Sequence, residues 1–152
     1  MIFYYLDASA WVKRYYLERG TAWIQVLFDA APTVACASLG LVEVMATLAR
    51  KHKAAEIDNA AFEQKVQELK DDWASFVQIH FTAQVVHGSQ EIAKHQALRG
   101  ADAIHLASAL LLASRFVEVD DRLIFVASDH ELNKAALSSG LEVIDPEEQE
   151  KK

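Results

Sequence analysis

The sequence has few residues that cross-link a chain or interrupt regular secondary structure. Cys36 is the single cysteine among 152 residues, which excludes an intrachain disulfide and argues against a cysteine-based zinc site. Two prolines and five glycines occur, and no linker, internal repeat or low-complexity tract divides the chain. We therefore expect one domain over residues 1–146, followed by a solvated C-terminal tail over residues 147–152.

Long apolar segments are also missing. The most apolar helical stretch, from Ala103 to Ala113, contains His105 and is too short to span a bilayer. The N-terminal apolar run has no basic segment before it, and Asp7 interrupts it, which argues against a signal peptide. These features predict a cytoplasmic protein that has no membrane partner.

Basic residues are in the minority. Lys and Arg number 15 against 22 Asp and Glu, so the net charge is −7 and the pI is about 5.3. This balance argues against binding to nucleic acid mainly through a broad basic surface. It does not exclude an enzyme that acts on nucleic acid, because bound divalent ions can supply positive charge locally.

Short apolar segments of strand length alternate with longer helical segments. This alternation predicts an α/β domain with a mainly parallel sheet of about five strands and helices on both faces. We expect strands at Ile2–Leu6, Thr33–Ala37, Gln78–Phe81, Leu123–Ala127 and Glu142–Ile144. We expect helices at Ser9–Leu17, Thr21–Ala31, Leu39–Lys53, Asn59–Phe76, Ala83–Gln96, Ala101–Phe116 and His130–Ser138.

Two aspartates lie within two residues of the ends of predicted strands. Asp7 follows the first strand, and Asp129 follows the fourth. Either could cap the helix that begins there, since Asp is a preferred N-cap residue, or it could hold a cation. Ligands of parallel sheets bind at the edge where the strands end and the strand order reverses. If these two strands are neighbours, the two carboxylates face one crevice.

Two further acids lie on predicted helices. Glu43 falls on the side of its helix opposite the apolar stripe, so periodicity alone favours a solvated glutamate. Asp102 lies in the first turn of a helix that is apolar in nearly every direction. The helix dipole is a sufficient structural reason for an acid there, but the position also brings a carboxylate close to the sheet edge. For Asp102 the structural and functional interpretations are evenly balanced.

Four segments of the chain resemble the four acidic motifs of the PIN domain. They are LDASAWVKRYY, LVEVMATLAR, LRGADAIHLASALLL and FVASDHELNKAALSSGLEVIDP, and they occur in order, at typical spacing, over nearly the whole chain. The most similar subgroup is that of the VapC ribonuclease toxins of toxin–antitoxin pairs. The resemblance implies a three-layer α/β/α fold and a ribonuclease that depends on Mg²⁺ or Mn²⁺. It places the catalytic and metal-binding acids at Asp7, Glu43, Asp102 and Asp129.

The resemblance also implies supporting residues and partners. The serine of the first motif falls on Ser9. A Thr or Ser is common two residues before the fourth acid, where this chain has Ala127 and carries its hydroxyl at Ser128 instead. The expected partners are an RNA substrate, a cognate antitoxin protein and a second copy of the chain in a homodimer.

Aromatic and basic side chains near the first motif allow two interpretations each. The aromatic residues either enter the core or form a groove for a helix of the antitoxin. The basic residues either contact RNA phosphates or are simply solvated. The aromatic set is Trp11, Tyr15, Tyr16, Trp23 and Phe28, and the basic set is Lys13, Arg14, Arg19, Arg50, Lys51 and Lys53.

Two alternative functions use similar residues. A phosphoacceptor or phosphatase-type domain also carries acids at strand ends, but Asp7 followed by Ser9 lacks the second aspartate of the phosphatase D-x-D signature. A non-catalytic PIN-like module that binds RNA or protein is the other alternative. The presence of all four acids counts against it.

Overall fold

A sheet of five parallel strands forms the centre of the computed structural model, which describes residues 1–116 and 118–150. The strand order is β3-β2-β1-β4-β5, so β1 pairs with both β2 and β4. The predicted parallel sheet is therefore confirmed, and the strands that precede Asp7 and Asp129 are neighbours. The strands are β1 (Ile2–Leu6), β2 (Thr33–Ala37), β3 (Val77–Ile79), β4 (Arg122–Val126) and β5 (Glu142–Ile144).

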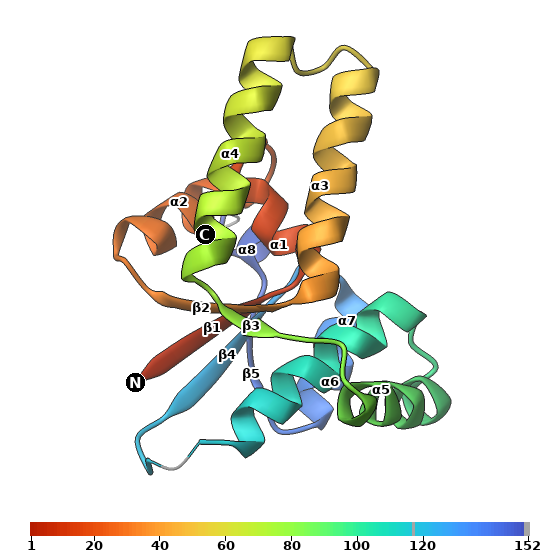
Figure 1. Ribbon diagram of the computed structural model, residues 1–152. Helices are drawn as coiled ribbons and strands as arrows, with labels where there is room; N and C mark the ends of the chain where they lie inside the picture. The colour runs from red at the N-terminus through yellow and green to blue at the C-terminus, as the bar shows by residue number, and fades with distance from the viewer. Residues whose placement is uncertain (117, 151–152) are drawn as a thin grey trace.

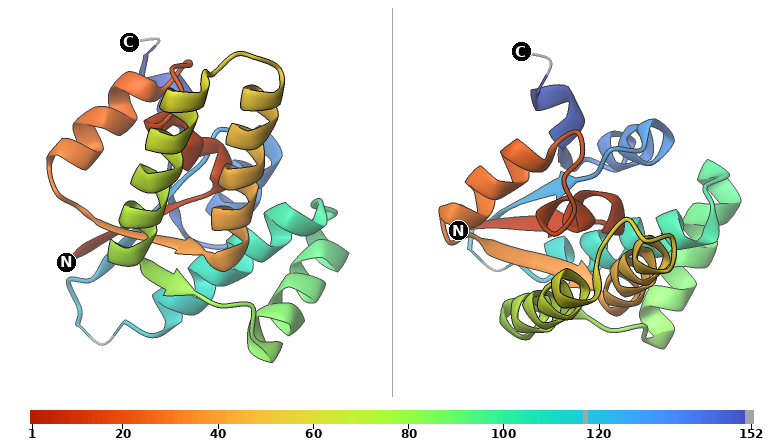
Figure 2. Two further views of the ribbon diagram at one scale, coloured as in Figure 1. Left: turned by 45° about the horizontal axis from the view of Figure 1, so that its top comes forward. Right: turned by 90° about the horizontal axis from the view of Figure 1, so that it is seen from above.

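Helices cover both faces of this sheet and make the three layers (Figures 1 and 2). α1 to α4 lie on one face, where α3 and α4 form a long antiparallel pair, and α5 to α7 lie on the other. No helix within the described ranges is long and apolar enough to cross a membrane. The helices are α1 (Ala8–Trp11), the 3₁₀ turn η1 (Val12–Arg14), α2 (Thr21–Asp29), α3 (Ser38–Lys53), α4 (Asn59–Ser75), α5 (Ala83–Gln96), α6 (Gly100–Ser114), α7 (His130–Ser138) and α8 (Pro146–Gln149).

The two central strands are apolar throughout because both of their faces are buried. Successive side chains of a strand point to opposite faces. Leu6 and Val126 accordingly pack under α1 and α3, whereas Tyr5 and Phe125 pack against α6 and α7. The rings of Tyr5 and Phe125 stack with their centroids 5.4 Å apart. Burial on both faces holds the ends of β1 and β4 in place, and these ends carry Asp7 and Asp129.

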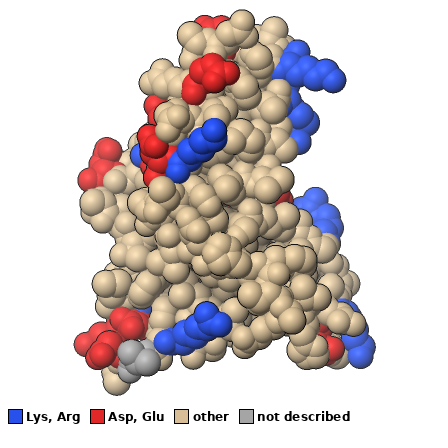
Figure 3. Space-filling view, in the orientation of Figure 1, with Lys and Arg blue, Asp and Glu red and all other residues tan. Residues whose placement is uncertain are grey.

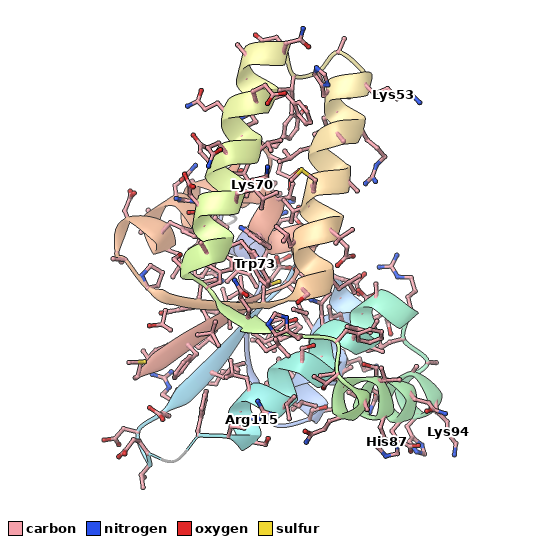
Figure 4. All side chains as sticks on the ribbon, viewed as in Figure 1. Lys53, Lys70, Trp73, His87, Lys94 and Arg115 are labelled. Carbon is pink, nitrogen blue, oxygen red and sulfur yellow. The ribbon has the colours of Figure 1, made fainter. Side chains whose placement is uncertain are left out.

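An aromatic cluster fills the core between α1 and α4. Trp11 is completely buried, and its ring centroid lies 4.8 Å from that of Phe76 and 6.0 Å from that of Trp73, which is labelled on α4 in Figure 4. The Trp11 indole N–H donates to the Tyr15 hydroxyl over 2.8 Å, and that hydroxyl donates to Asp72. Trp11 and Tyr15 therefore belong to the core, and neither lines a groove formed by the described residues.

The C-terminal segment differs from the solvated tail expected from the sequence. It forms the short helix α8, in which Asp145 is the N-cap, Pro146 is buried, and the helix packs against α2. The Ala22 backbone N–H donates to a Glu150 carboxylate oxygen over 3.3 Å. Residues 151–152 of the expected tail lie outside the described residues.

Candidate metal and catalytic site

A cleft of about 340 Å³ opens at the edge of the sheet where the strands end. The carboxyl ends of β1 and β4 and the first turns of α3 and α6 meet there. The structure thus brings together all four of the acids singled out from the sequence, together with both serines. The lining residues are Asp7, Ala8, Ser9, Glu43, Arg99, Asp102, His105, Ser128, Asp129 and Glu147.

Asp7 caps the helix that follows β1, and it also lines the cleft. Its Oδ1 accepts hydrogen bonds from the Ala10 N–H over 3.0 Å and from the Ser9 hydroxyl over 2.7 Å, so it caps α1. The residue is only 4% exposed. Burial raises the pKa of Asp7; His105 and these hydrogen bonds oppose that rise, and the charge of Asp102 adds to it. A charged carboxylate held in this position is stabilised by a nearby cation.

The two serines tie the ends of β1 and β4 together. The Ser9 hydroxyl donates to Asp7 and accepts a hydrogen bond from the Ser128 backbone N–H over 3.4 Å. The Ser128 hydroxyl oxygen is itself buried and has no hydrogen-bond partner among the described residues. Because buried polar atoms are normally paired, this oxygen is suited to a ligand or a water molecule in the cleft.

Arg99 bridges the two remaining aspartates. It precedes α6 and donates to the Asp102 carboxylate over 3.1 Å and to the Asp129 carboxylate over 3.4 Å. Asp129 also caps α7 by accepting from the Leu132 N–H. The Arg99 side chain is 77% exposed, so it covers the mouth of the cleft. Arg99 is not among the residues expected from the sequence, where its signal is a basic side chain three positions before a first-turn acid.

Glu43 faces the cleft, and the solvated interpretation that periodicity favoured is wrong. Its carboxylate is one-third exposed and lies 2.6 Å from Nε2 of His105. At Glu43, the helix side opposite the apolar stripe therefore contacts α6 and faces the cleft. His105, to which the sequence analysis assigned no role, is buried against this site.

Glu147 adds a fifth acid that the sequence analysis placed in the solvated tail. It lies in the first turn of α8 and lines the cleft. Lys13 is buried, with its ammonium 3.0 Å from Glu18 and 3.9 Å from Glu147. Lys13 is therefore paired within the protein and is not placed to contact RNA.

The other basic residues considered as phosphate contacts are dispersed. Arg14 pairs with Asp72 over 2.6 Å, and Lys51 lies over the ring of Tyr16. Lys53 projects from the end of α3 that is far from the sheet (Figure 4). Arg50, by contrast, lines a groove next to the cleft. The face in Figure 3 likewise shows Lys and Arg scattered, with no broad basic area.

The donor set fits a hard divalent cation. All of the acidic groups offer carboxylate oxygens, which are the ligands that Mg²⁺ and Mn²⁺ prefer. Arg99 pairs with Asp102 and Asp129, so a metal ion held by both carboxylates would have to displace its guanidinium. Among the described residues, the one trio whose ligand atoms all lie within 4.8 Å of one another is instead His130, Asp145 and Glu148.

A parallel α/β sheet with acids from four separate segments gathered at its carboxyl edge defines the class of protein. The family model described as PIN domain matches residues 4–129. The chain belongs to the PIN-domain family, as its motifs indicated.

Particular relatives agree with this assignment. The chain is 32% identical over 139 residues to ribonuclease VapC45 of Mycobacterium tuberculosis, which covers 91% of this chain and 92% of the relative. A toxin–antitoxin complex from Klebsiella pneumoniae contains a chain of similar fold, with a TM-score of 0.63, 17% identity and coverage of 93% and 96% of the two chains. VapBC2 of Rickettsia felis, bound to a DNA fragment from its promoter, gives a TM-score of 0.64 at 16% identity and covers 95% and 98%.

Proposed function

We propose that this protein is a divalent-metal-dependent endoribonuclease and the toxin of a toxin–antitoxin pair. The observation that carries the proposal is the convergence of Asp7, Glu43, Asp102 and Asp129 on one cleft at the sheet edge. The relative named a ribonuclease supports the activity. The structural neighbours described as toxin–antitoxin complexes support the pairing with an antitoxin. An RNA substrate is consistent with action in the cytoplasm.

The four acids would hold Mg²⁺ or Mn²⁺. Asp7 and Asp102 are the least exposed of them and lie at the inner part of the cleft, so we assign them as direct ligands, with Glu43 and Asp129 completing the site. When bound, the metal ion supplies charge stabilisation at the phosphate oxygens and lowers the pKa of coordinated water. Ser9 orients Asp7 through its 2.7 Å hydrogen bond.

Arg99 is suited to bind the substrate phosphate. Its guanidinium is exposed at the mouth of the cleft and is held there by Asp102 and Asp129. The guanidinium can donate to an RNA phosphate, for which its planar fork is well matched, and a bound cation would compete with it for these carboxylates. A single arginine with a bound cation provides positive charge at the cleft of a protein whose net charge is −7.

A groove beside the cleft is suited to bind the antitoxin. It has a volume of about 450 Å³ and shares Ser9 and Glu43 with the cleft. Val42 projects into it from α3 and is 65% exposed, while Val12 contributes apolar surface from η1. An amphipathic helix binds such grooves through spaced apolar side chains. This groove replaces the aromatic one expected from the sequence.

The activity itself is tested with the purified protein and single-stranded RNA. We expect cleavage in millimolar Mn²⁺ or Mg²⁺ and none after EDTA is added, because the acids alone cannot neutralise the phosphate charge. Gel analysis of end-labelled RNA measures it. Cleavage that is unaffected by EDTA would overturn the proposal, and labelling of the protein by acetyl phosphate would favour the phosphoacceptor alternative.

A further inference from the structure

A buried chain of hydrogen bonds leads from the sheet to Glu43. The Ala37 backbone N–H donates to the Tyr5 hydroxyl over 3.2 Å. That hydroxyl lies 2.8 Å from Nδ1 of His105, and Nε2 of the same ring lies 2.6 Å from Glu43 Oε1. Tyr5 is completely buried and His105 is 2% exposed. Both ring nitrogens of a buried histidine are thus paired, one with the sheet and one with the cleft.

The groups at the two ends of this series of hydrogen bonds define which atoms of Tyr5 and His105 carry protons. The Ala37 N–H can only donate, so the Tyr5 oxygen accepts it and is free to give its own proton to Nδ1 of His105. Burial raises the pKa of Tyr5 well above its usual value, which keeps that proton on the hydroxyl. A carboxylate can only accept, so Nε2 carries the proton that is donated to Glu43. The hydrogen-bond direction runs from the sheet outward to the carboxylate.

Local packing holds the histidine ring at this distance from α3. A Cβ atom at Gly40 would lie 2.3 Å from Cys36 Sγ and 3.3 Å from Cε1 of His105. The lack of a side chain at Gly40 therefore lets α3 approach the ring closely. Glu43 lies one turn further along α3, on the same side, and its carboxylate reaches Nε2.

We propose that His105 is a positioning residue that holds the Glu43 carboxylate in the cleft, and that Tyr5 fixes its ring. This inference rests on the proposed function of the cleft. Glutamate has three rotatable side-chain bonds, and the Glu43 carboxylate is partly exposed, so without a donor it samples positions that do not face a bound cation. Partners that orient metal ligands typically change metal affinity or activity about 10–100-fold when removed.

Two substitutions of His105 separate positioning from simple core filling. In His105→Asn the amide ends near the position of Nδ1 and cannot reach Glu43, whereas in His105→Gln it reaches the position of Nε2. We expect His105→Asn to weaken Mn²⁺ binding about 10-fold and to lower kcat similarly, with little change in the KM for RNA. His105→Gln should restore most of both. Calorimetric titration of metal-free protein with Mn²⁺ and steady-state cleavage measure these quantities.

A double-mutant cycle with Glu43→Ala, which removes the acceptor of the His105 hydrogen bond, tests whether His105 acts through Glu43. If it does, His105→Asn causes no further loss of Mn²⁺ affinity in the Glu43→Ala background. His52→Asn is the matched control, because His52 bonds Asn59 over 2.6 Å at the far end of α3; it should leave Mn²⁺ affinity unchanged.

Wild-type Mn²⁺ affinity in His105→Asn, or an equal further loss in the Glu43→Ala background, would overturn the inference. If His105→Asn does not fold by thermal melting, Tyr5→Phe removes only the hydroxyl and should weaken Mn²⁺ binding in the same direction; wild-type affinity in that variant would overturn the inference equally. If the wild-type protein binds Mn²⁺ but cleaves no RNA, the proposed function is wrong. The Mn²⁺ titrations of the His105 variants then still test the positioning role of His105.

Discussion

Asp102→Asn is expected to abolish metal-dependent RNA cleavage while the protein remains folded. The amide keeps the volume of the carboxylate but removes the charge that holds a cation and Arg99. Metal ions stabilise transition-state charge by several kcal/mol, and each 1.36 kcal/mol is tenfold in rate, so the loss should be roughly 1,000-fold. Loss of a first-turn acid costs α6 only about 0.3–1 kcal/mol. Cleavage rates at saturating Mn²⁺ and thermal melts measure the two effects.

Asp7→Asn should lower cleavage to the same extent, because it also removes a charged ligand of the proposed metal site. Asn is an equally good N-cap residue, so the variant keeps the cap of α1 and should remain folded. The control is Asp71→Asn, which neutralises an exposed acid on α4. Asp71 accepts a hydrogen bond from Gln67 and does not line the cleft. We expect wild-type rates from it. Wild-type cleavage by both the Asp7 and the Asp102 variants would rule out the nuclease mechanism.

Val42→Glu is expected to leave RNA cleavage intact but to prevent neutralisation by the antitoxin. Val42 is two-thirds exposed in the apolar groove beside the cleft, and a charge buried there on binding would be unpaired. Central interface residues commonly contribute 2 kcal/mol or more, so we expect affinity for the product of the adjacent upstream gene to fall roughly 100-fold. Co-expressing cells should therefore stop growing with Val42→Glu and grow with wild type.

Val26→Glu provides the matched control for the groove. Val26 is 69% exposed on α2, outside the residues that line the groove, so its variant should still be neutralised. Pull-down of the co-expressed antitoxin quantifies the difference between the two variants. Equal capture by Val42→Glu and wild type would place the antitoxin elsewhere on the molecule.

The sheet edge was predictable because its signals are local. The runs Ile2–Leu6 and Leu123–Ala127 are apolar without alternation, which indicates strands buried on both faces. Both are followed by an aspartate. The structure adds that these strands are neighbours, with β1 pairing β4 in parallel register.

The environment of Glu43 was not predictable from local pattern. Helical periodicity identifies the side of α3 that faces the core, but it does not reveal that α6 covers the opposite side. The contact with His105 joins residues 62 positions apart. The four motifs identified Glu43 only through their resemblance to the PIN domain.

The burial of the aromatic side chains near the first motif was not predictable for a similar reason. Trp11 stacks on Trp73, and the local sequence around either residue does not indicate that their helices pack against each other. Aromatic side chains near a site indicate a core as readily as a groove, and only the long-range contacts decide. Glu147 was missed because α8 packs against α2 and reaches the cleft from the other end of the chain.

Anomalous diffraction from crystals grown with Mn²⁺ tests most directly whether the cleft is a metal site. The four-carboxylate account predicts an anomalous peak in the cleft, in contact with Asp7 and Asp102, and an Arg99 side chain displaced from between Asp102 and Asp129. His130, Asp145 and Glu148 form a competing trio of potential ligands on the same structure. A Mn²⁺ peak at that trio with none in the cleft, from protein that cleaves RNA, would contradict the account.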